Sequence, residues 1–164
     1  MGTPFTQVYN RFLGKITDDM YMELTPEDTS RDLRNLLIDA IPGFEFPRKN
    51  LLDYTLIEAE NALEEESSFA VDLSSEEINI LAILMMISWV QRQVTSIENT
   101  RMKYSSSDFK FTSQANHLSK LLTLLTETQR QSHHMQRLYK RRRTDKEGVY
   151  ESNWSVLRDS SALD

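Results

Sequence analysis

The sequence predicts a mainly α-helical protein: a small helical bundle built on a long antiparallel helical hairpin, followed by an extended C-terminal arm. The chain has 164 residues but only 4 Gly and 4 Pro, and neither type occurs from Lys49 to Glu147. An all-β sandwich or barrel needs frequent tight turns, so this stretch argues against one. Apolar residues within it recur at three- and four-residue spacing, which is typical of amphipathic helices.

The composition limits the kind of protein further. Hydrophobic residues make up 39% of the chain, which is enough to form a core. The absence of cysteine excludes structural disulfides and thiolate metal sites. The net charge of -6 conceals two parts of opposite sign. Residues 1–100 carry 7 Lys and Arg against 18 Asp and Glu, whereas residues 101–164 carry 12 against 7.

Two helices are expected near the N-terminus. Thr3-Pro4 supplies an N-cap followed by proline at the first helical position, and this helix should end near Gly14. Thr25-Pro26 repeats the signal for a second helix. Pro42-Gly43 should end that helix, because proline cannot continue it.

Residues 48–73 are expected to form an acidic loop or a small hairpin inserted into the bundle. The aromatic residues of 44–46 alternate with a charge and suggest a short strand, and 51–56 suggests a second strand or a turn. No Lys or Arg occurs from Leu51 to Gln91. Runs of acidic residues are usually solvated, so a loop is the simplest interpretation.

The first long helix begins at a capping box. Ser74 is the predicted cap, and Glu77 lies three positions further on, where its side chain can reach back to the cap. The helix should run to about Met102, with a turn at residues 104–108.

The second long helix should begin after a cap at Thr112 or Ser113. A short connection makes the two long helices antiparallel neighbours. The expected organisation is therefore a helical bundle domain at 1–143 and an extended C-terminal docking arm at 144–164.

The first long helix, which follows the Ser74 cap, is apolar on nearly every side in its first half. From Ile78 to Val90 only Asn79 and Ser88 interrupt it, and this run is too short to span a membrane. Two interpretations follow: neighbouring helices of the same chain bury it, or part of it faces another subunit. The candidates for such a subunit interface are Ile83, Met86, Ile87 and Trp89.

The sequence offers little support for catalysis, and we expect no enzyme activity, no cofactor and no metal. His133 and His134 are adjacent on a helix and point about 100° apart, while His117 lies about four turns upstream. Neither an HExxH pattern nor a Gly-x-Ser-x-Gly elbow occurs.

The second long helix ends in a basic run. Such a cluster can bind phosphates, can bind a protein partner, or can simply complement the negative end of the helix dipole. All three interpretations stay open on the sequence. The run consists of Arg137, Lys140, Arg141, Arg142, Arg143 and Lys146.

Several local sequence segments of the chain resemble those of the head-to-tail connector proteins of tailed bacteriophages, which are also called adaptor or head-completion proteins. The likeness is carried by residues 102–118, by Gln136 to Arg142 and by Ser152-Asn153-Trp154-Ser155. It covers most of the chain and is weakest over residues 48–73. These are not catalytic signatures.

The resemblance implies a structural virion protein at the head-tail interface, assembled in the host cytoplasm. It implies a homo-oligomeric ring, typically dodecameric, beneath the portal protein and above the next neck or tail-completion protein. DNA would pass through its channel without sequence-specific binding, and no membrane would be involved. Glu64, Glu65 and Glu66 would face this channel. The expected contacts to the portal or a neighbouring subunit are Lys140, Arg141, Arg142, Arg143, Tyr150, Trp154 and Leu157.

Two other interpretations stay open. One is a small nucleic-acid-binding protein that uses the basic helix end, and it predicts salt-dependent binding to duplex DNA. The other is a helical adaptor unrelated to virions.

Overall fold

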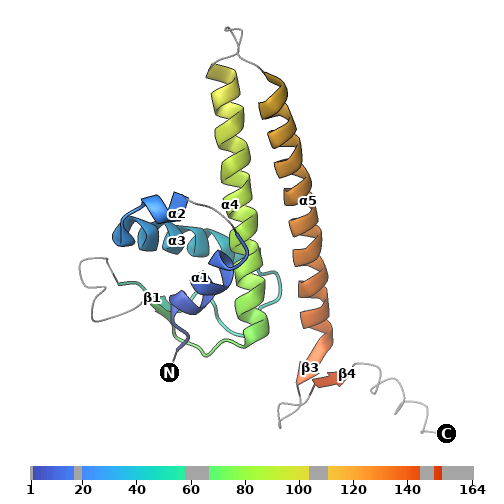
Figure 1. The fold of residues 1–164 in the computed structure, drawn as a ribbon. Coiled ribbons are helices and arrows are strands. Elements are labelled where there is room, and N and C mark those ends of the chain that lie inside the picture. The colour runs from blue at the N-terminus through green and yellow to red at the C-terminus, as the bar shows by residue number, and fades with distance from the viewer. Residues whose placement is uncertain (1, 17–19, 58–66, 104–110, 145–149, 153–164) are drawn as a thin grey trace, which may run out of the picture.

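The computed structural model describes residues 2–16, 20–57, 67–103, 111–144 and 150–152. It confirms a mainly helical fold built on a long helix pair, α4 (Ser75–Lys103) and α5 (Phe111–Arg141). Three shorter helices, α1 (Phe5–Leu13), α2 (Met20–Glu23) and α3 (Pro26–Ala40), lie on the side of α4 that faces away from α5 (Figure 1).

The first helix begins one residue later than the sequence predicts, and Thr3 is not its cap. The N-cap is Pro4, which makes no side-chain capping bond. Thr3 is instead held by residues that precede α4: its hydroxyl accepts a hydrogen bond from the Leu73 N–H at 2.6 Å. Its own N–H donates to the Val71 carbonyl at 3.1 Å, and its carbonyl accepts from the Phe69 N–H at 2.9 Å. Thr3 therefore ties the N-terminus to the segment that leads into α4.

The helix α3 forms as predicted. The Thr25 hydroxyl accepts a hydrogen bond from the Asp28 N–H at 3.2 Å, and Pro26 occupies the first helical position. The chain leaves the helix through one 3-10 turn, η1 (Ile41–Gly43). The short helix α2 was not predicted from the sequence.

The segment after η1 contains one small hairpin but no strand at residues 44–46. Strand β1 (Tyr54–Thr55) pairs antiparallel with β2 (Ser68–Phe69), and residues 58–66 between them lie outside the described part of the chain. Phe5 of α1 packs against this hairpin, with its ring centroid 5.8 Å from that of Tyr54 and 4.7 Å from that of Phe69. The hairpin thus closes one side of the core.

The capping box of α4 is present. The Glu77 N–H donates to the Ser74 hydroxyl at 3.3 Å, and the Ser74 N–H donates to a Glu77 carboxylate oxygen at 2.7 Å. The helix α5 begins at Phe111, so Thr112 and Ser113 lie inside its first turn and are not caps. The predicted turn at 104–108 lies outside the described residues.

The apolar half of α4 is buried within the chain itself. The main core joins α1, α3, η1 and the first half of α4, and it also includes Tyr139 near the end of α5. A second and smaller cluster holds the far half of the hairpin together and has Val90, Val94 and Leu118 as its buried members. By length and composition alone, Ser75–Asn99 could cross a membrane, but 44% of its most apolar window is buried inside the protein.

Leu81→Ala should lower the free energy of unfolding by about 2–5 kcal/mol, because it removes a fully buried side chain from the main core. Urea denaturation followed by circular dichroism measures this. Leu52, whose side chain is 73% exposed, provides the matched control, and Leu52→Ala should change the stability by no more than about 0.5 kcal/mol. Equal losses for the two variants would contradict this placement of the core.

Candidate partner-binding surface

The basic end of α5 is held in place by a loop that lies about 90 residues earlier in the chain. The Arg48 guanidinium lies over the Tyr139 ring, 4.3 Å from its centroid. It donates to the Tyr139 carbonyl at 2.6 Å and also to the Arg142 carbonyl. The last carbonyls of a helix lack partners within the helix, so Arg48 acts as a C-terminal cap.

Two cations of the basic run itself have side-chain partners in the chain. The Lys140 ammonium lies 3.9 Å from the centroid of the Phe46 ring. Arg142 donates to the Glu76 carboxylate at 2.8 Å, which joins the end of α5 to the start of α4. This aromatic contact could not be predicted from the sequence, because Phe46 and Lys140 are far apart in the chain.

Gln136 joins the same loop to α5 from the buried side. Its side-chain amide donates to the Gly43 carbonyl and to the Ser132 hydroxyl, both at 3.2 Å. Its side-chain oxygen accepts from the Glu45 N–H at 2.8 Å. A buried amide with three satisfied hydrogen bonds fixes the position of the loop on the helix.

A carboxylate lies at the centre of this junction. Glu77 is only 3% exposed, and it accepts hydrogen bonds from the Tyr139 hydroxyl at 2.6 Å and from both the backbone and the hydroxyl of Ser74. The Lys49 ammonium lies 4.0 Å away. Burial alone raises the pKa of Glu77, but these hydrogen bonds and the charge of Lys49 outweigh it, so the pKa is lowered. Burial and the bond to Glu77 raise the pKa of Tyr139.

The predicted partner-binding residues are brought together only in part. Lys140, Arg141 and Arg142 are exposed at the end of α5. The chain then turns back, because β3 (Arg142–Thr144) pairs antiparallel with β4 (Tyr150–Ser152), with Arg143 opposite Glu151 and Thr144 opposite Tyr150. Residues 142–144 and 150–152 therefore form a small hairpin at the start of the predicted extended arm. Trp154 and Leu157 lie outside the described residues.

The four residues of the predicted subunit interface on α4 have little solvent-accessible area in the single chain. Ile83 is 2% exposed in the single chain, which leaves it almost no area for contact with another copy. Met86, Ile87 and Trp89 are half-buried against the two cores. Among the described residues, the exposed large apolar side chains all lie outside α4: Leu24, Phe46, Leu52, Leu56, Leu122 and Leu124. Glu64, Glu65 and Glu66 lie outside the described part of the chain.

The three histidine side chains do not form a cluster. His133 Nδ1 lies 3.3 Å from the Glu45 carboxylate at an exposed position, and His117 and His134 are exposed. The described residues contain no group of three or more His, Asp or Glu side chains that could hold a metal ion.

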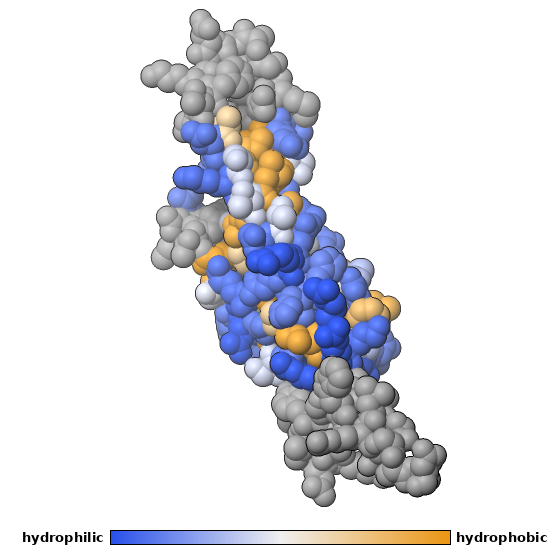
Figure 2. Space-filling model, turned by 90° about the vertical axis from the view of Figure 1, so that its right-hand side faces the viewer, coloured by the Kyte–Doolittle hydropathy of each residue, from blue (hydrophilic) through white to orange (hydrophobic). Residues whose placement is uncertain are grey.

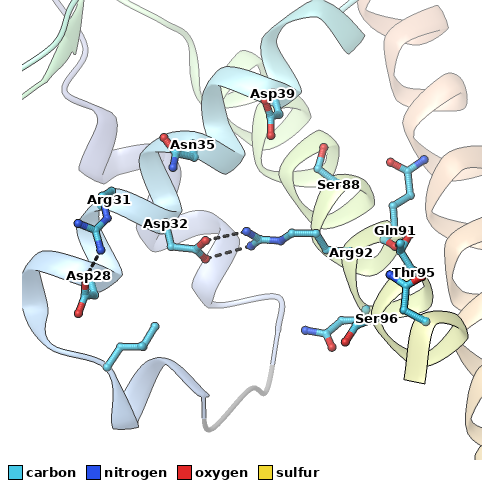
Figure 3. A pocket seen from close by; sticks show the side chains of 13 residues that line it. Asp28, Arg31, Asp32, Asn35, Asp39, Ser88, Gln91, Arg92, Thr95 and Ser96 are labelled. Carbon is cyan, nitrogen blue, oxygen red and sulfur yellow. Dashed lines mark hydrogen bonds and ion pairs between the residues drawn. The ribbon is translucent and has the colours of Figure 1, made fainter. Parts of the chain in front are cut away.

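An open polar groove lies between α3 and the far half of α4. The Arg92 guanidinium spans it and donates to both Asp32 carboxylate oxygens, at 2.6 and 3.0 Å (Figure 3). The Tyr21 hydroxyl donates to the same carboxylate at 2.8 Å. Burial raises the pKa of Asp32, but Arg92 and Tyr21 outweigh this and lower it. The groove has a volume of about 1060 Å³ and was not predicted from the sequence.

Tyr139→Phe should lower the free energy of unfolding by about 1.5–3 kcal/mol, because it leaves a buried carboxylate without one of its donors. Urea denaturation at neutral pH measures the change. Tyr54→Phe is the matched control, since the Tyr54 ring packs in the core while its hydroxyl makes no hydrogen bond with the described residues. If both variants lose the same free energy of unfolding, the hydrogen bond from the Tyr139 hydroxyl to Glu77 does not stabilise the fold.

The stabilising effect of Glu77 should disappear in acid. Its folded pKa lies below the ordinary value of 4.5, so its contribution is complete above that pH and is lost as the pH falls through the folded pKa. At pH 7 the natural chain should therefore be more stable than Glu77→Gln, and the difference should shrink towards pH 3. Urea midpoints of both chains across this range measure it. A difference that stays constant with pH would refute the assignment.

Comparisons of the chain with models of protein families, with curated proteins and with solved structures found no match. The expected likeness to head-to-tail connector proteins therefore rests on residues 102–118, 136–142 and 152–155 of the sequence alone.

Proposed function

We propose that this chain is a structural protein of a tailed-bacteriophage virion, a head-to-tail connector. Copies of it would form a ring beneath the portal protein, extend the DNA channel, and join the capsid to the neck or tail. The chain would act by holding partners together rather than by chemistry.

The observation that supports this proposal is that the C-terminal end of α5 is held in a fixed position. Arg48, Gln136 and Glu77 fix the last turns of α5 by hydrogen bonds from three directions. Lys140 and Arg141 are exposed on this rigid base, beside the half-exposed ring of Phe46. A cationic and aromatic surface held in one conformation is typical of the energetic centre of a protein–protein contact, because little side-chain entropy is lost on binding.

The shape of the described part agrees with such a role. The helix pair α4 and α5 projects well beyond the helices at its base (Figure 1). The basic surface thus lies at one end of the molecule, and the far half of the α4–α5 pair extends toward the other end. A scaffolding protein that touches partners on more than one side needs such separated surfaces.

The rival proposal of nucleic-acid binding draws on the same basic run. Two observations weigh against that role. Arg142 of the run is paired with Glu76, and the adjacent Arg48, which is not part of the run, is engaged by backbone carbonyls, so these two guanidinium groups already have partners. Phosphate binding depends on cations that can neutralise the backbone directly.

Removal of the residues after Arg143 should abolish docking to the portal while the helical domain stays folded. The measurement is particle size, by light scattering and negative-stain imaging, with and without a candidate portal protein. The full chain should give annular particles with the portal, and the truncated chain should not. Circular dichroism should report the same helix content for both.

A chain that ends at Ser152 is the matched control, because it keeps the β3–β4 hairpin and removes only the residues after it. Docking by this control but not by the shorter chain would assign the contact to the hairpin. Unchanged docking by the shorter chain would exclude the C-terminal residues from the contact. A monomer that binds duplex DNA in a salt-dependent manner would overturn the connector proposal.

A further inference from the structure

We infer that the ion pair between Arg142 and Glu76 sets the direction in which the C-terminal hairpin β3–β4 leaves the helical domain. The two side chains are then positioning residues, because they hold the start of the predicted docking arm in one orientation. The orientation of the hairpin is a property of the chain itself, whereas its consequence for docking rests on the proposed function.

Arg142 lies at the boundary between the helix and the hairpin. It directly follows Arg141, the last residue of α5, and it is the first residue of β3, where it pairs with Ser152 of β4. Any bond that fixes Arg142 therefore also fixes the point and the direction from which the hairpin starts.

Arg142 is bonded to the helical domain through both its backbone and its side chain. Its carbonyl accepts a hydrogen bond from Arg48, and its guanidinium donates to the Glu76 carboxylate at 2.8 Å. These partners come from different segments, the loop after η1 and the first turn of α4. Two contacts from different segments restrain rotation as well as position, which a single contact does not.

The ends of the two long helices favour this ion pair. Glu76 lies in the first turn of α4, where the helix dipole favours an acid, and Arg142 follows the last turn of α5, where the dipole favours a cation. These two helix ends lie beside each other at the base of the molecule (Figure 1). The Glu76 side chain is 18% exposed and the Arg142 side chain 45%, so the pair is partly shielded from water and ions.

The hairpin starts from a mainly hydrophilic part of the surface. Among the described residues, the main backbone neighbours of β3 and β4 are each other and the end of α5. Figure 2, which views the α5 side, shows a mainly hydrophilic surface over the base of the molecule, with small apolar patches. Hydrogen-bonded ion pairs are directional, whereas apolar burial is not, so the contacts of Arg142 set the orientation where apolar surface is scarce.

An open cleft beside the pair gives Arg142 room to move when Glu76 is replaced. The cleft has a volume of about 460 Å³ and lies between α1, α4 and α5. Both members of the pair line it, and so does Arg11 of α1, which donates to the Ser75 hydroxyl at 3.5 Å. A long side chain that faces open space regains many rotamers once its partner is removed. Loss of the Glu76 carboxylate should therefore release the hairpin.

The absence of cysteine from the chain allows spin labels at two chosen sites to report the direction of the hairpin. Glu151→Cys labels β4, and Asn10→Cys labels an exposed position of α1. In the otherwise natural chain, double electron–electron resonance should give one narrow distribution of the distance between the labels. Glu76→Gln in this background should widen the distribution about twofold or more, because rotamers of Arg142 are regained. Circular dichroism should report the same helix content for both chains.

Replacement of the other partner should have the same effect. Arg142→Gln should widen the distribution as much as Glu76→Gln, and the double variant should add little, because all three variants lack the same contact. Arg11→Gln is the matched control, since it removes an arginine that lines the same cleft but belongs to α1. A narrow distribution in Glu76→Gln, or equal widening in Arg11→Gln, would overturn the inference.

The orientation of the hairpin should also depend on salt, because the Arg142 side chain is nearly half exposed. Salt at about 1 M limits the attraction between exposed charges to about 3 Å. The distance distribution of the natural chain should therefore widen towards that of Glu76→Gln as salt is added, whereas that of Glu76→Gln should stay the same. A natural distribution that ignores salt would show that another contact orients the hairpin.

A docking measurement separates the inference from the proposed function. If the released hairpin has the docking direction for about one-tenth of the time, its Kd for a candidate portal protein should rise about tenfold. Wider distances with weaker docking support both proposals. Wider distances with unchanged docking support the role of the pair and exclude the hairpin direction from the docking contact.

Two further outcomes are decisive. Wider distances in Glu76→Gln, together with a natural chain that forms no annular particles with any portal protein tested, would support the role of the pair and contradict the connector role. Annular particles together with a narrow distribution in Glu76→Gln would overturn the inference alone.

Discussion

The buried carboxylate of Glu77 is the constraint on which the arrangement of this protein depends. It caps the start of α4 through Ser74, and it accepts the hydroxyl of Tyr139 from the last turns of α5. One side chain therefore fixes the two ends of the hairpin that lie at its base. Removing a charge of this kind from water is costly unless every lone pair finds a donor, and here the backbone, two hydroxyls and Lys49 surround it.

Other contacts extend outward from this junction. Tyr139 packs edge-on against Phe44 with ring centroids 5.4 Å apart, and the Arg48 guanidinium lies over the Tyr139 ring. Because Gln136 holds residues 43–45 at the same place, the loop after α3 is attached to α5 while α3 itself packs on α4. The basic surface is therefore positioned by the junction at the base, whereas the groove is held by the bonds of Asp32 with Arg92 and Tyr21.

The helices could be predicted from the sequence because their signals are local. The Thr25-Pro26 cap and the capping box of Ser74 satisfy backbone groups within three residues, and Pro42-Gly43 acts locally because proline cannot continue a helix. Thr3 carries the same local signal, yet its hydroxyl bonds Leu73 instead, since a partner 70 residues away competes for it. The junction and the groove could not be predicted for this reason: Arg48 meets Tyr139, and Asp32 meets Arg92, only after distant segments pack together.

The far half of the hairpin has a different character from its base. Among the described residues, the small apolar cluster there has Val90, Val94 and Leu118 as its buried members. Its backbone amides should exchange with solvent through local opening at a much lower free energy than those beside Glu77, where opening requires the whole core to come apart. Each copy of the chain therefore has a rigid base beside Glu77 and a more readily opened far half, whatever it assembles with.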